Sequence, residues 1–189
     1  MVALCNKTYP DPVIKIDSLN DIVPEGLMLP VPGVDYGTLD SLLGYAVRRA
    51  QNALYLDFYR ATAAWGISPQ RFAALVLIAR NPGLRQGVLG QAMGLHRSGA
   101  LRLTDWLTAQ GYAERRDTPD DARAWGLHLT ATGKRLLVKL EAAVAAHDRN
   151  LLQALGDQGP ALKAGLERLA WVATAQSTIP DNKPRRQKP

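Results

Sequence analysis

The sequence lacks the features that several large classes of protein need. Its single cysteine, Cys5, can form neither an internal disulfide nor a cysteine-based zinc site, so we expect a reducing, cytoplasmic environment. No stretch approaches the roughly 20 consecutive apolar residues of a membrane-spanning helix, and the first residues do not have the basic-then-apolar layout of a secretory signal. The sequence therefore predicts no membrane partner.

Metal-binding and catalytic motifs are also missing. The three histidines, His96, His128 and His147, are far apart and have no ligand partner four residues away, and His147 fits a packed or interface position better than a metal site. No serine elbow or paired-carboxylate motif supports the alternative of a catabolic or hydrolytic enzyme. The glycine-rich residues 87–94 follow no strand and precede no Gly-Lys-Ser, so helix packing and a turn explain them better than a phosphate loop. We expect no catalytic residue, no metal and no cofactor.

Positive charge is what the sequence has in excess. The net charge of +6 and the isoelectric point near 9.7 favour a polyanionic partner such as DNA. Residues 1–37 contain five prolines and are net acidic, which predicts an extended arm. Residues 38–175 form the predicted regulatory domain, and residues 176–189 a basic flexible tail that is either a solvated end or a non-specific DNA tether.

Apolar periodicity and turn residues predict a mainly helical chain with one β-hairpin. A long helix is expected to open at 38–41 and to end by Gly66, and Ser68-Pro69 is typical of the start of the next one. Two short helices follow over residues 85–93 and 97–110, and then a hairpin with strands at 112–116 and 125–130. Two further helices are expected over residues 131–155 and 159–172.

A short helix, a glycine turn, a second short helix and a hairpin follow one another in the order of a winged helix-turn-helix. In that arrangement the second helix enters the DNA major groove and the hairpin tip, or wing, reaches the backbone or the minor groove. The segment "PGLRQGVLGQAMGLHRSGALRLTDWLTAQGYAERRDTPDDARAWGLHLTATG" resembles the MarR (multiple antibiotic resistance regulator) family of bacterial transcription factors, and the resemblance extends over residues 39–172. Its most specific piece is the wing, residues 121–124 followed by Leu129-Thr130 and Gly133.

The resemblance implies a homodimeric repressor that binds double-stranded DNA and is released by a small ligand, with long terminal helices that dimerise. We expect DNA contacts at five positions of this chain: Arg97, Ser98, Arg102, Arg115 and Arg123. Arg115, like its neighbour Arg116, could instead only solvate the edge of a strand. Arg123 aligns with the arginine that the family places in the minor groove, and Asp120 or Asp121 would stabilise the tip or hold Arg123. Gly99 and Leu101 stand where the family offers hydroxyl residues. They favour the alternative of a winged-helix interaction module that has lost specific DNA binding.

A polar and aromatic stripe runs beside the apolar face of the first long helix. Its members are Tyr45, Arg48, Arg49, Asn52, Tyr55 and Tyr59. Tyrosine rings with a cation suit an aromatic carboxylate or its coenzyme A thioester, which would connect the protein to aromatic compound catabolism. The same rings could instead lie at the border of the hydrophobic core and bind no ligand.

Overall fold

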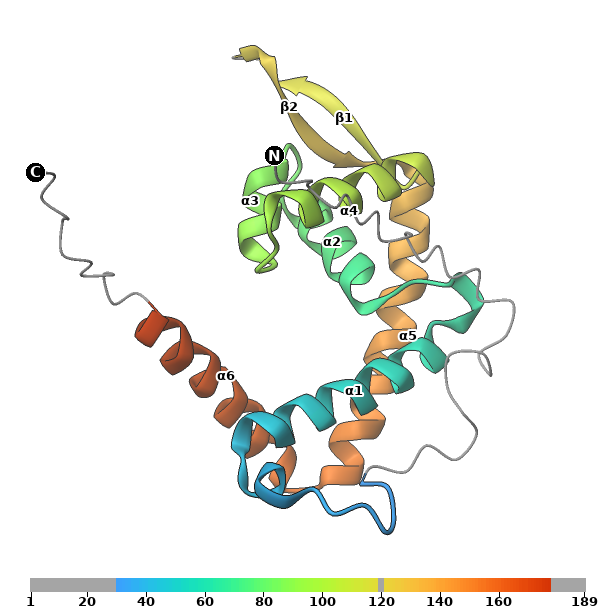
Figure 1. The fold of residues 1–189 in the computed structure, drawn as a ribbon. Coiled ribbons are helices and arrows are strands. Elements are labelled where there is room, and N and C mark those ends of the chain that lie inside the picture. The colour runs from blue at the N-terminus through green and yellow to red at the C-terminus, as the bar shows by residue number, and fades with distance from the viewer. Residues whose placement is uncertain (1–29, 119–120, 178–189) are drawn as a thin grey trace, which may run out of the picture. The chain divides into compact units, whose positions relative to one another are not determined.

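The computed structural model describes residues 30–118 and 121–177, which fall into two compact units within residues 1–144 and 145–189 (Figure 1). The predicted arm up to residue 29, the predicted tail from residue 178, Cys5 and Asp120 lie outside the described residues. Among the described residues, no helix is long and apolar enough to cross a bilayer.

The first unit carries the predicted order of helices and hairpin. Its elements are η2 (Gly37–Ser41), α1 (Leu43–Ala61), η3 (Ala63–Trp65), α2 (Pro69–Arg80), α3 (Gln86–Ala92), α4 (Arg97–Ala109), β1 (Ala113–Thr118) and β2 (Asp121–Leu129). Helix α5 (Ala131–Leu155) begins in this unit and ends in the second, where α6 (Gln158–Ser177) follows. This mainly helical fold with a two-stranded wing confirms the predicted fold class.

The start of the first long helix is wrong in the sequence prediction. Residues 37–41 form a separate 3₁₀ helix, and Leu42 is extended, so α1 begins only at Leu43. The Ser41 hydroxyl donates a hydrogen bond to the carbonyl oxygen of Thr38 at 2.8 Å. It therefore stabilises the 3₁₀ turn rather than capping α1. By contrast, Ser68 caps α2 as predicted, because its hydroxyl accepts a hydrogen bond from the amide of Arg71 at 3.2 Å and Pro69 occupies the first turn.

The core of the first unit joins its helices to the wing. Seven large side chains of this core are fully buried or almost so: Ile67, Leu75, Ile78, Leu89, Leu107, Leu127 and Leu140. They come from α2, α3, α4, β2 and α5 and from the turn before α2. Burial of each side chain stabilises the fold by roughly 1.5–3 kcal/mol. Helices α3 and α4 and the wing therefore pack on one common hydrophobic core.

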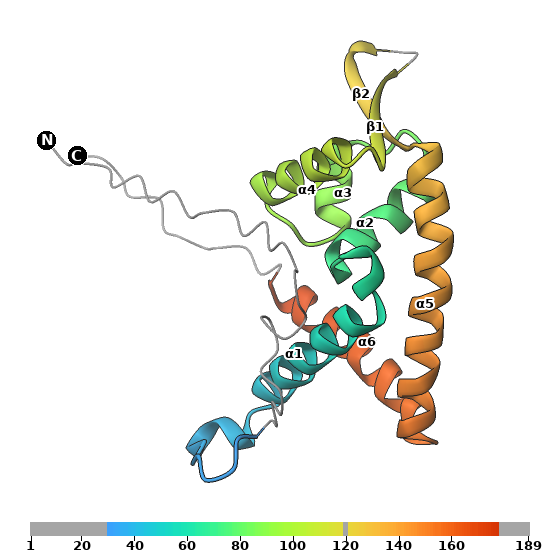
Figure 2. The same cartoon turned by 90° about the vertical axis from the view of Figure 1, so that its right-hand side faces the viewer.

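The wing is an antiparallel pair whose base is attached to the turn between α2 and α3. Arg115 lies opposite Leu127 and Arg116 opposite Gly126. The amide of Gly83 donates to the carbonyl of Leu127 at 2.9 Å, and the amide of Leu127 donates to the carbonyl of Leu84 at 3.0 Å. The hairpin extends away from α2, α3 and α4 in both views (Figures 1 and 2).

Candidate nucleic-acid interface

Helix α4 has one buried face and one exposed face. Ala100, Leu103, Thr104 and Leu107 are buried in the core. The residues between them, at helical spacing on the opposite side, are exposed: Arg97, Ser98, Leu101, Arg102 and Asp105. Three predicted DNA-contact residues, Arg97, Ser98 and Arg102, therefore share a single face. In the described part of the chain, neither Arg97 nor Arg102 forms an ion pair, so both cations face solvent.

Helix α4 is fixed in place by close contacts to its neighbours. A Cβ atom at Gly90 of α3 would lie 3.0 Å from the Cβ of Ala100, so this glycine lets the two helices touch. Gly94 has a positive φ of 64° in the turn that follows. These two positions confirm the packing-and-turn interpretation of the glycine-rich segment.

An arginine–aromatic contact holds the other end of α4. The guanidinium of Arg71 on α2 lies 3.6 Å from the ring centroid of Trp106, and the Trp106 and Tyr112 rings are 6.0 Å apart. Three segments, α2, α4 and the start of the wing, are thereby joined through a single indole ring.

The two arginines of β1 both have carboxylate partners. Arg115 pairs with Asp105 of α4, and its guanidinium lies 4.4 Å from the ring centroid of Trp125 on β2. Arg116 pairs with Glu114. Arg115 thus connects α4 with both strands of the wing, which the sequence prediction of a DNA contact did not anticipate.

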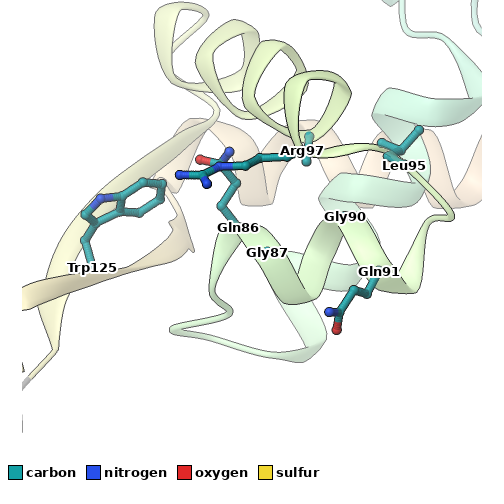
Figure 3. Close-up of a pocket in the computed structure, with 8 residues that line it drawn as sticks. Gln86, Gly87, Gly90, Gln91, Leu95, Arg97 and Trp125 are labelled. Carbon is teal, nitrogen blue, oxygen red and sulfur yellow. The ribbon is translucent and has the colours of Figure 1, made fainter. Parts of the chain in front are cut away.

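A hollow of about 550 Å³ opens between α3, the start of α4 and the wing (Figure 3). It is lined by Gln86, Gly87, Gly90, Gln91, Leu95, Arg97, Ala100 and Trp125. Arg97 extends from α4 toward Trp125 and Gln86. Arg97 is a predicted DNA contact, whereas the sequence analysis did not single out Gln86 or Trp125, which line the same hollow. The alternation of Trp125 with polar neighbours on β2 predicted only a half-buried strand position.

The tip of the wing is described only in part. The backbone of Arg123 lies in β2, two residues before Trp125, and pairing between β1 and β2 becomes irregular between Asp117 and Thr118. The side chains of Asp121 and Arg123 lie outside the described residues. Their predicted roles stay predictions.

The polar and aromatic stripe of α1 divides into two groups. Arg48, Asn52 and Tyr55 line an open hollow of about 420 Å³ together with Gln51. Tyr45 instead packs against Tyr36, with ring centroids 6.1 Å apart.

The remaining stripe residues point to Arg48 as the cation of this hollow. Arg49 lies 5.9 Å from the Tyr45 ring centroid and pairs with Asp40 at 3.5 Å. Tyr59 is half-buried nearer the end of α1. Of the six predicted ligand residues, the structure therefore gathers three around one space and gives Arg49 a carboxylate partner elsewhere.

The candidate histidine positions show no metal cluster. His147 is half-buried on α5, in the second unit, and takes part in at least one interaction. Within residues 30–118 and 121–177, no three histidine, cysteine or carboxylate side chains come together as metal ligands would.

Comparisons with known proteins identify relatives of this chain and similar solved structures. The sequence profile of the MarR family matches residues 65–124, which extend from the end of η3 into the wing. A Thauera aromatica protein named for transcriptional regulation of the hcr operon is 34% identical over 123 residues, which are 65% of this chain and 74% of that protein. The transcriptional repressor CouR bound to a 23-mer DNA duplex is 33% identical, with a TM-score of 0.67 over 74% of this chain and 98% of that chain. CouR bound to p-coumaroyl-CoA is 31% identical, with a TM-score of 0.66 over 74% of this chain and 97% of that chain.

Proposed function

The chain belongs to the MarR family of transcriptional regulators, and on this premise we propose that it is a cytoplasmic homodimeric repressor of a near-palindromic operator, released by a small ligand. The observation that carries the proposal is the exposed face of α4, where Arg97 and Arg102 have no carboxylate partner among the described side chains, beside an attached wing. We assign no catalytic role to any residue.

Each predicted DNA-contact residue has a role in this proposal. Arg97, Ser98 and Arg102 lie on the exposed face of α4, where hydrogen-bond donors can reach base edges and phosphates of a major groove. Arg123 enters the minor groove from the wing, because its weakly hydrated guanidinium suits the negative potential there. Arg115 acts mainly as a positioning residue, since its charge is already paired with Asp105.

The hollow between α3, α4 and the wing seats the sugar–phosphate backbone beside the bound groove. Its polar lining offers donors from the Arg97 guanidinium and the Gln86 amide, and the six-membered ring of Trp125 faces these two side chains (Figure 3). Most protein–DNA hydrogen bonds reach phosphate and sugar and fix the register of the protein on the duplex. Gln86 and Trp125 thereby join the predicted interface.

Exposed apolar side chains support a dimer. On η2, α1 and the residue between them, Leu39, Leu42, Leu43 and Leu54 are all more than 40% exposed. On α6, in the second unit, Leu162 and Leu166 are also more than 40% exposed, and Trp171 is 73% exposed. Contiguous exposed apolar surface marks association sites. A second copy would cover these helices, in agreement with the dimerisation helices implied by the family resemblance.

The hollow on α1 is the proposed effector site. Its lining combines a cation, two amides and a phenol, which suit a carboxylate attached to an aromatic body. CouR, one of the similar structures, was solved with p-coumaroyl-CoA. We therefore propose an aromatic carboxylate or its coenzyme A thioester as the effector of this chain.

A gel shift with the DNA upstream of the protein's own gene tests the function. We expect a saturable complex that competitor DNA of random sequence does not displace, and that an effector disperses. One observation favours the alternative of an interaction module, namely the 45% exposed Leu101 in the middle of α4. If neither upstream DNA nor a randomised duplex pool yields a specific complex, the interaction module is the better interpretation.

A further inference from the structure

Leu101 is the large apolar residue of α4 that is exposed. Leu103 and Leu107 of the same helix are at most 8% exposed, whereas Leu101 is 45% exposed. Exposed apolar area is unfavourable by about 25 cal/mol per Å², and Leu101 leaves 45% of its surface exposed. Its exposure fits a contact made outside the monomer.

The neighbours of Leu101 restrict what that contact can be. Arg97 lies one helical turn before it, and Arg102 follows it directly, so a cation stands on either side of the apolar side chain. Both cations face solvent, and the helix lies beside a hollow lined by Arg97 and Trp125. A partner that suits this face carries negative charges that meet the two arginines and an apolar group that meets Leu101 between them.

A DNA major groove has this pattern at a thymine. Phosphates border the groove, and the C5-methyl group of thymine is the apolar group among the base edges that it displays. Hydrogen-bonding residues such as Ser98 cannot bond to a methyl group, whereas a leucine can bury it.

We propose that Leu101 reads the C5-methyl group of one thymine in each half-site and is thus a specificity-determining residue. The inference rests on the proposed DNA-binding function. A leucine cannot form hydrogen bonds to a base edge. It can still distinguish thymine from the other bases through an apolar contact with the methyl group.

The test removes the methyl group from the DNA instead of changing the protein. A randomised duplex pool first supplies the preferred site of the full-length chain. Each thymine is then replaced in turn, in both half-sites, by deoxyuridine, which lacks only the C5-methyl group. We expect one symmetric position to weaken wild-type binding about fourfold per half-site, the fold-change that corresponds to about 0.8 kcal/mol for one buried carbon group.

The variant Leu101→Ala completes a cycle with the modified DNA. It should bind thymine-containing DNA more weakly than wild type and show no further loss at the deoxyuridine position. Val138→Ala, which truncates a 67% exposed side chain of α5, is the control and should keep the wild-type response to deoxyuridine. Circular dichroism and a thermal melt of both variants confirm that the fold is intact.

The outcomes separate this inference from the function on which it rests. A pool that yields no preferred duplex contradicts the repressor function and this inference together. A preferred duplex that tolerates deoxyuridine everywhere, or that discriminates equally well with Leu101→Ala, leaves the repressor function standing and overturns the role of Leu101. Unchanged affinity of Leu101→Ala for the thymine-containing site overturns it too.

Discussion

The guanidinium of Arg115 on β1 pairs with the carboxylate of Asp105 on α4, ten residues earlier in the chain. The same guanidinium lies 4.4 Å from the ring centroid of Trp125 on β2. One side chain thus links the exposed face of α4 to both strands of the wing. The Arg115 side chain is 35% exposed and that of Asp105 is 52% exposed, so solvent screens the charges, and the aromatic contact adds to the ion pair. We expect this link, together with the backbone hydrogen bonds at the base of the wing, to help set the reach of the wing along a duplex.

The first prediction separates positioning from phosphate contact at Arg115. Arg115→Ala should weaken operator binding about tenfold, because the wing loses its attachment to Asp105, while the slope of log affinity against log salt stays unchanged. Arg102→Ala should reduce that slope by about one, as expected for a phosphate contact. Fluorescence anisotropy over a salt series measures both. A reduced slope for Arg115→Ala would restore the simple DNA contact that the sequence predicts.

The second prediction concerns the wing tip. Arg123→Ala should weaken operator binding by about 1–3 kcal/mol, the range for one good groove contact, with little change in thermal stability. Lys163→Ala on α6 is a matched removal of one positive charge and should leave affinity nearly unchanged. Unchanged operator affinity of a folded Arg123→Ala protein would remove the wing tip from the mechanism.

Local signals in the sequence predicted most of the fold. Ser68-Pro69 marked the start of α2, and the two-residue alternation around Leu127 marked β2, because capping and strand periodicity depend on adjacent residues. The start of α1 was not predicted correctly, because the Ser41 hydroxyl donates a hydrogen bond to the carbonyl of Thr38. A serine in this position could equally cap a helix, and the sequence alone does not show which of the two hydrogen bonds forms.

The candidate site was less predictable, because it depends on contacts between distant residues. The exposed face of α4 followed from helical periodicity, and Arg97, Ser98 and Arg102 were placed on it. The pairing of Arg115 with Asp105 and of Arg49 with Asp40 depends on how separate elements meet. Asp105 and Asp40 therefore pair with two arginines for which the sequence predicted a DNA contact and a ligand contact.

The third prediction tests the attachment of the wing to the turn before α3. A Cβ atom at Gly126 would lie 2.5 Å from the carbonyl oxygen of Gly83, a backbone atom that cannot move aside. Gly126→Ala should therefore lower the free energy of unfolding by about 1–3 kcal/mol, as overpacking does. Gly87→Ala in α3 meets no atom within 4 Å and should be neutral or slightly stabilising. Urea denaturation compares the two, and equal stabilities would contradict the close approach.

The fourth prediction concerns assembly. Two-fold pairing should place the two α4 helices about one DNA turn apart, roughly 34–36 Å, and should require a near-palindromic site. Sedimentation equilibrium should show a dimer at micromolar concentration, and Trp171→Glu should weaken it because a charge replaces an exposed apolar ring. Val138→Glu is the control for a charge placed on exposed apolar surface. Tight binding of a single half-site by a monomer would contradict this assembly.

The last prediction concerns the effector. Arg48, Asn52 and Tyr55 line the hollow on α1, and Arg48 is its cation because Arg49 pairs with Asp40. A volume of about 420 Å³ accommodates an aromatic acid, with any coenzyme A portion outside. An effector disperses the DNA complex only if it prefers the DNA-incompetent state, and a tenfold preference corresponds to about 1.4 kcal/mol per site. Calorimetry with benzoate- and cinnamate-type acids and their coenzyme A thioesters should therefore detect binding that Arg48→Ala weakens at least tenfold. The control Arg60→Ala, an exposed arginine in the last turn of α1, should bind as wild type does. If these compounds do not bind, or if Arg48→Ala binds them as tightly as Arg60→Ala, the effector site lies elsewhere.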